Sequence, residues 1–138
     1  CENAEKVVNF LKKHKEVTKV IYSTEHEKKI ADRAKQYLRG GNGPMVGIEL
    51  KGGIEAGKKF IESLKMFYHV ANIGDARSLA IHPASTTHSQ LNEKELAASG
   101  VTQSYVRLCI GIEHIDDIID DLDQALNKSS KGSLKAVS

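Results

Sequence analysis

The sequence predicts a mixed fold, α/β or α+β, with one sheet and helices packed mainly on one of its faces. Segments of helical periodicity alternate with short β-rich segments along the chain, which is the pattern of a layered domain. The length of 138 residues suits one domain and is too short for two. Hydrophobic residues make up 40% and charged residues 28%, a globular balance that disfavours disorder, collagen and coiled coil.

The first half of the chain is predicted to alternate helix and strand twice. The expected elements are a helix over residues 3–14, a strand over 18–22, a helix over 25–39 and a strand over 45–50. In the second helix, four apolar residues are expected on one side: Ile30, Ala31, Ala34 and Leu38. The run GGNGP at residues 40–44 ends this helix, because Gly and Asn tolerate a left-handed turn and Pro cannot continue a helix.

The second half is predicted to contain three more strands and to end in a helix. Gly52 and Gly53 open a helix, and apolar residues at helical spacing mark the last helix, whose acidic residues face outwards. The expected elements are a helix over 54–65, extended segments over 67–71 and 78–82, a polar loop over 84–89, a short helix over 92–99, a strand over 105–111 and a helix over 114–127. Residues 128–138, rich in Ser and Lys, are expected to form a flexible tail.

Charge and composition exclude several classes of protein. A net charge of +2, with no Trp and few aromatic residues, does not favour nucleic acid as a partner. The apolar runs are far too short to cross a bilayer, and no apolar leader follows Cys1. We therefore expect no membrane or export targeting, and a chain that begins within a longer protein. Cys1 and Cys109 form no disulfide framework, which favours a reducing, cytoplasmic location.

Three features that suggest chemistry have simpler structural interpretations. The glycines of residues 40–43 stand between a helix and a strand, the reverse of the order in a phosphate loop, so they predict a turn. His82, His88 and His114 lack metal-ligand spacing, so no metal site is expected. Cys109 lies among apolar strand residues with no nearby base, which predicts a buried and unreactive thiol.

Arg107 stands out because it lies within an otherwise apolar strand. A guanidinium keeps its charge, so inside a buried strand it needs an anionic partner. That partner is either an Asp or Glu of the chain or a substrate carboxylate held by two parallel hydrogen bonds. The loop at 74–79 offers small residues, backbone N–H groups and the hydroxyl of Ser78, as a carboxylate site requires, although most such loops are only turns.

Three segments together resemble a known family. They are MVGIELKGG at 45–53, the stretch from NIGDARS at 72–78 through HPASTTHSQ at 82–90, and VRLCIGIE at 106–113. They are similar to the Cys/Met-metabolism enzymes that use pyridoxal 5′-phosphate, and within these most similar to the O-acetylhomoserine sulfhydrylases. The resemblance runs over residues 3–127, nearly the whole chain.

The resemblance implies that residues 1–127 are the C-terminal small domain of a larger fold-type-I enzyme. In the family this domain is a small, mostly antiparallel sheet with helices on its outer face, packed on a large cofactor domain in a tetramer. The large domain carries the Schiff-base lysine and the cofactor site, so the resemblance implies no catalytic and no cofactor-binding residue here. The implied parent activity is sulfhydrylation of O-acetyl-L-homoserine to homocysteine, and the isolated chain is expected to be inactive.

The resemblance also assigns roles to individual residues. The arginine that binds the substrate carboxylate matches Arg107, and the adjoining carboxylate-binding loop matches Ser78 and Leu79. Arg77 matches a variable position near the substrate entrance, and Thr87 matches a residue close to the substrate side chain.

Other assignments remain open at the level of the sequence. The same domain occurs in cystathionine γ-synthases and γ-lyases, which share the outline with different residues in the first loop. A free-standing module that binds a small carboxylate and regulates another process would use the same segments. A nucleic-acid binder using the basic residues of 1–39 would require steeply salt-dependent binding.

Overall fold

The computed structural model describes residues 1–86, 90, 95, 98 and 101–130. Predicted features on the other residues, among them Thr87, His88 and most of the expected helix over 92–99, lie outside the described part. The described elements are α1 (Glu2–Leu11), β1 (Val17–Ile21), α2 (Lys28–Tyr37), β2 (Met45–Leu50), α3 (Gly53–Ser63), β3 (Tyr68–His69), β4 (Leu79–Ile81), the 3-10 helix η1 (Pro83–Ser85), β5 (Tyr105–Cys109) and α5 (Ile115–Ser130).

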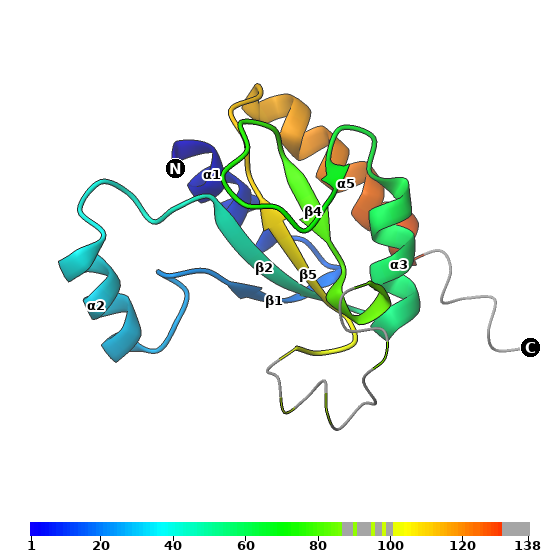
Figure 1. The fold of residues 1–138 in the computed structure, drawn as a ribbon, viewed down its shortest axis with the longest axis horizontal. Helices are drawn as coiled ribbons and strands as arrows, with labels where there is room; N and C mark the ends of the chain where they lie inside the picture. The colour runs from blue at the N-terminus through cyan, green and yellow to red at the C-terminus, as the bar shows by residue number, and fades with distance from the viewer. Residues whose placement is uncertain (87–89, 91–94, 96–97, 99–100, 131–138) are drawn as a thin grey trace, which may run out of the picture.

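The sheet has five strands in the order β1-β2-β5-β4-β3 (Figure 1). The first three pairings are antiparallel, and only β3 and β4 run parallel. The mostly antiparallel sheet predicted from the sequence is thereby confirmed. β5, which lies at the centre, places Arg107 opposite Gly47 on one side and opposite Ile81 on the other.

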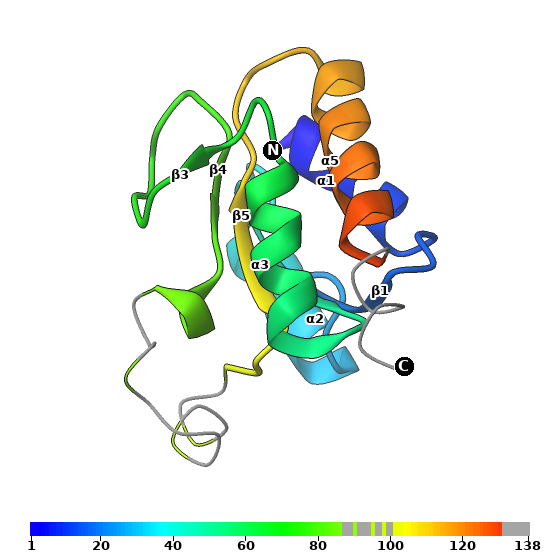
Figure 2. The ribbon, with the colours of Figure 1, turned by 90° about the vertical axis from the view of Figure 1, so that its right-hand side faces the viewer.

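Three helices, α1, α3 and α5, cover one face of this sheet, as Figure 2 shows from the side. Their apolar sides and the inward residues of the strands form one core, whose fully buried members include Phe60, Ile118 and Leu122. No helix of the described residues covers the other face, and the loop at 70–77 passes over it. The expected arrangement of helices on one face is thus confirmed for these three helices, and it leaves the second face open.

The helix α2 is shorter than the predicted 25–39 and lies apart from the other helices. It projects beyond the β1 and β2 side of the sheet (Figure 1), and Ala34 is its only buried residue. Ile30 and Leu38, on the apolar side expected for this helix, are 46% and 44% exposed. The periodicity therefore identified the helix correctly, and its apolar side stays largely exposed because no described element packs closely against it.

Two smaller differences concern the other end of the chain. α5 continues past its predicted end to Ser130, and Ser129 is buried, so these residues belong to the helix and not to a tail. The first two residues of the predicted polar loop, Ala84 and Ser85, belong to the turn η1, which begins at Pro83. Among the described residues, no helix is long and apolar enough to span a membrane.

Candidate functional site on the open face of the sheet

Alternation along β5 places Arg107 on the open face. Val106 and Leu108 point into the core and are fully buried. Because successive strand residues point to opposite faces, Tyr105, Arg107 and Cys109 lie on the face opposite α1, α3 and α5. The central position of β5 holds the arginine away from both edges of the sheet.

Only some hydrogen-bond donors of the Arg107 guanidinium have a partner among the described residues. Its Nη2 donates to the carbonyl oxygen of Asn72 at 3.4 Å, and its buried Nε has no hydrogen-bond partner among the described residues. Within the same part of the chain, no Asp or Glu oxygen forms an ion pair with it. An internal carboxylate is therefore not the anionic partner in the described chain, which favours an external carboxylate.

Three neighbours shape the surroundings of Arg107. Gly47, on the adjacent strand, leaves a space that the Tyr105 ring fills, and a Cβ there would overlap this ring. Burial raises the pKa of the Tyr105 phenol, so this group stays uncharged near neutral pH. Cys109 is buried, as predicted, and burial raises the pKa of its thiol as well. The open face beside Arg107 therefore lacks a thiolate nucleophile in the described part of the chain.

Ser78 and Leu79 lie where β4 begins, and both are buried. Leu79 pairs with Cys109 across the sheet and so shares the open face with Arg107. The Ser78 hydroxyl and N–H both donate to the Glu113 carboxylate, at 2.9 and 2.6 Å. The structure thus brings the predicted loop to the same face as the arginine, with the Ser78 donors already engaged within the chain.

Arg77 is held at the rim of this face and not beside Arg107. Its Nε and Nη2 donate to the two carboxylate oxygens of Asp75 at 3.2 and 3.1 Å, and its guanidinium stacks over the Tyr68 ring at 4.3 Å. The hydrogen bonds from Arg77 lower the pKa of the Asp75 carboxyl. Since Tyr68 belongs to β3, the Arg77 guanidinium lies over β3, which is two strands from β5 and Arg107. Thr87 lies outside the described residues.

His82 is a structural residue of this region. It is 1% exposed, and its Nε2 lies 2.7 Å from the carbonyl oxygen of Gln103, which can only accept. Nε2 therefore carries the proton, and Nδ1 accepts from Ser85 at 2.8 Å. The ring packs on Gly57 of α3, where any side chain would overlap it. His82 thus links the segment after β4 to the segment before β5 and to α3.

Lowering the pH is expected to destabilise the fold through His82. Burial lowers the pKa of His82 below its ordinary value of 6.5, so the folded state disfavours the protonated ring. Its stabilising contribution is therefore complete above about pH 6.5 and is lost as the pH falls towards the lower folded pKa. Urea unfolding between about pH 7.5 and 5.5 tests this: replacing His82 with Gln should flatten the pH dependence, and an unchanged slope would contradict the prediction.

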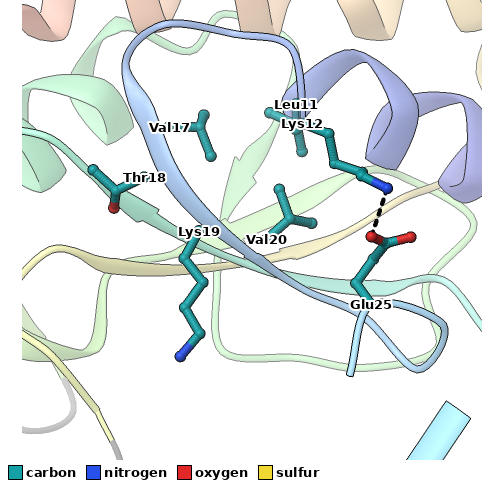
Figure 3. Close-up of a pocket in the computed structure, with 7 residues that line it drawn as sticks. All are labelled: Leu11, Lys12, Val17, Thr18, Lys19, Val20 and Glu25. Atoms are coloured by element: carbon teal, nitrogen blue, oxygen red, sulfur yellow. Dashed lines mark ion pairs between the residues drawn. The ribbon is translucent and has the colours of Figure 1, made fainter. Parts of the chain in front are cut away.

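Two hollows lie at the edges of the sheet. A hollow of about 230 Å³ lies at the β1 edge between Val17 and Leu11, and an ion pair of 2.6 Å between Lys12 and Glu25 crosses it (Figure 3). It lies two strands from Arg107 and offers no unpaired buried donor among the described residues. At the opposite edge, an apolar hollow of about 490 Å³ lies between α3 and β4, lined in part by Ile61, Val70 and Ile81. The Arg107 region is therefore the candidate site.

Sequence reasoning missed two residues of this site, Asn72 and Glu113. Asn72 supplies the carbonyl that Arg107 and the Cys109 thiol approach, and Glu113 binds the donors of Ser78. Both act across separations of 35 residues or more along the chain. Neither residue stands out from the hydrophobic or charge pattern of its neighbours. The only sequence signal is that each lies in a segment that resembles the family.

Solved structures with the same fold define the class of protein. A putative O-acetylhomoserine (thiol)-lyase from Campylobacter jejuni, with a pyridoxyl-lysine phosphate, superposes with a TM-score of 0.82 at 41% identity, covering 91% of this chain and 30% of that one. A cystathionine γ-synthase from Xanthomonas oryzae, in complex with cystathionine, gives a TM-score of 0.80 at 31% identity, covering 94% and 33%. The fold is that of a domain from fold-type-I enzymes dependent on pyridoxal phosphate.

The sequence comparisons identify the family. The model of the Cys/Met metabolism PLP-dependent enzymes matches residues 1–127, and the chain belongs to this family. The O-acetyl-L-homoserine sulfhydrylase of Leptospira meyeri is 52% identical over 125 residues, which are 90% of this chain. The chain spans only 28% of the length of that relative. The family resemblance expected from the sequence motifs is confirmed.

Proposed function

We propose that this chain is the C-terminal small domain of a larger O-acetylhomoserine sulfhydrylase, where Arg107 binds the carboxylate of the amino-acid substrate. The observation that carries this proposal is the buried Nε of Arg107, which lacks a partner in the described chain and lies on the open face of the sheet. The two donors of a planar guanidinium fit a carboxylate and would fix the orientation of the substrate. The similarity to named sulfhydrylases, 52% in the Leptospira relative, supports the substrate class.

The cofactor site does not fit within the described part of this chain. A Schiff-base lysine works from an enclosed site, where desolvation lowers its pKa. Every lysine of the described residues is exposed or half-buried. Pyridoxal phosphate is therefore expected to bind to the large domain of the same polypeptide, and the role left to this chain is to position the substrate.

The open face also suits contact with a large domain. Exposed apolar side chains lie on it and in the loop that crosses it, namely Met45, Tyr68, Val70 and Ile73, with exposed fractions between 41% and 57%. Apolar groups of this size favour burial against another domain. We include in the proposal a tetrameric, cytoplasmic parent enzyme, in keeping with the free cysteines Cys1 and Cys109.

A cystathionine γ-synthase is the alternative within the family. The solved structure of such an enzyme is 31% identical to this chain, against 41% for the structure of the O-acetylhomoserine (thiol)-lyase. This difference favours the sulfhydrylase.

We expect turnover by the full-length polypeptide and none by residues 1–138 alone. The full-length protein, loaded with pyridoxal phosphate, should form homocysteine from O-acetyl-L-homoserine and sulfide. Assays with methanethiol or cysteine as the thiol, and with the succinyl ester, establish the preferred substrates. Turnover by the isolated chain, or cystathionine as the main product from cysteine, would overturn the proposal.

A further inference from the structure

Glu113 lies in the turn between β5 and α5, and its carboxylate holds the start of β4. It accepts the N–H of Ser78 at 2.6 Å and the hydroxyl of Ser78 at 2.9 Å. Ser78 is completely buried, whereas Glu113 is half-buried. Hydrogen bonds to a charged acceptor are the stronger kind, so Ser78 is held firmly in one orientation.

The same contacts join the turn after β5 to the loop before β4. The Ser78 hydroxyl oxygen accepts the N–H of Gly111 at 2.9 Å. The N–H of Ile112 donates to the carbonyl oxygen of Ala76 at 2.9 Å. These two bonds, together with the carboxylate, connect residues that are about 35 positions apart in the sequence.

The turn itself is fixed from both sides. The Asn3 side chain, on α1, donates to the carbonyl oxygens of Glu113 at 2.9 Å and of Gly111 at 3.3 Å. A Cβ at residue 111 would overlap the Glu113 carboxylate and the backbone of Ala76, so the approach requires glycine. Glu113 therefore belongs to a cluster of residues joined by hydrogen bonds. This cluster, which we call the Glu113 cluster, consists of Asn3, Ala76, Ser78, Gly111, Ile112 and Glu113.

The Glu113 cluster holds one end of the loop at 72–77 by hydrogen bonds, and Arg107 forms a hydrogen bond with the other end. The carbonyl oxygen of Asn72 is the acceptor of the Arg107 guanidinium at 3.4 Å. A loop anchored at residues 76 and 78 holds that carbonyl in place. Releasing the anchor would free the loop and, with it, the only described hydrogen-bond acceptor of Arg107.

We propose that Glu113 is a positioning residue for carboxylate recognition. It acts through Ser78 and the loop at 72–77 on the orientation of Arg107, without contact with the substrate. This inference rests on the proposed function, since it assigns Glu113 a role in the binding of the same substrate carboxylate.

The test uses the full-length enzyme and two substrates, O-acetyl-L-homoserine and its carboxamide. Glu113→Ala should lower kcat/KM for the carboxylate substrate about tenfold or more, mainly through KM, and leave the poorer carboxamide substrate unchanged. Ser78→Ala should have the same effect, and the double variant should be little worse than either single variant. The matched control, Glu62→Ala on the exposed side of α3, should behave as wild type.

The remaining outcomes would overturn either the role of Glu113 or the proposed function. An equal loss for both substrates, or no loss, would overturn the role of Glu113, and Glu113→Gln serves as the second variant if Glu113→Ala does not fold. A wild-type enzyme without turnover of O-acetyl-L-homoserine would overturn the proposed function instead. In that case amide hydrogen exchange of the full-length protein tests the positioning role of Glu113 separately. Glu113→Ala should accelerate exchange across residues 72–79. Unchanged exchange there would overturn the positioning role.

Discussion

Replacing Arg107 with Ala in the full-length enzyme is expected to lower kcat/KM for O-acetyl-L-homoserine by about a hundredfold or more. The variant loses two charge-assisted hydrogen bonds to the substrate carboxylate, each of which contributes about 1.5–3 kcal/mol. The bound cofactor should keep its absorbance, because the proposal places the cofactor in the large domain. Steady-state kinetics and an absorbance spectrum of the same sample measure both quantities.

Two further variants provide an intermediate case and a control for this experiment. Arg107→Lys retains the charge but cannot form the planar pair of hydrogen bonds, so it should give an intermediate loss. Arg39→Ala, an exposed arginine after α2, should leave the kinetics unchanged. Loss of the cofactor spectrum in Arg107→Ala would indicate instead that the arginine maintains the structure.

Replacing Phe60 with Ala is expected to cost about 3–5 kcal/mol of unfolding free energy. Phe60, on α3, is completely buried in the core between the sheet and the helices. Removing its ring leaves a cavity that the neighbouring side chains fill only in part. Because the chain has no Trp, urea unfolding of residues 1–138 followed by circular dichroism is the suitable measurement.

Tyr37 on α2 provides the matched control for this prediction. Its ring is 72% exposed, so Tyr37→Ala should change the unfolding free energy by no more than about 0.5 kcal/mol. Equal losses for the two variants would show that α2 packs in solution against a surface that the structure leaves uncovered. A small loss for Phe60→Ala would contradict the core described above.

The elements and the faces of this domain were largely predictable from local sequence. The strand over residues 45–50 matches β2 residue for residue, because apolar residues at alternate positions and the glycines on both sides define it. The prediction also placed Arg107 in a strand of apolar neighbours, and the alternation of β5 explains why it lies on the face opposite Val106 and Leu108. The motif resemblance then indicated the family, which the comparisons confirmed.

The exposure of α2 could not be read from its periodicity. An apolar stripe shows which side of a helix would face a partner, but not whether that partner is present in the chain. Ile30 and Leu38 satisfy the helical pattern and still remain exposed. Burial depends on the assembled fold, so it is decided by the elements that pack against the helix and not by the helix itself.

The strands, most of the helices, the position of Arg107 within a strand and the family could all be predicted from local sequence. The groups that surround this arginine are known only from the folded structure. Periodicity and turn chemistry act over a few neighbouring residues, so they are visible in the sequence. The bonds from Glu113 to Ser78 and from Arg107 to Asn72 each span 35 positions, and they form only when the folded sheet brings those segments together.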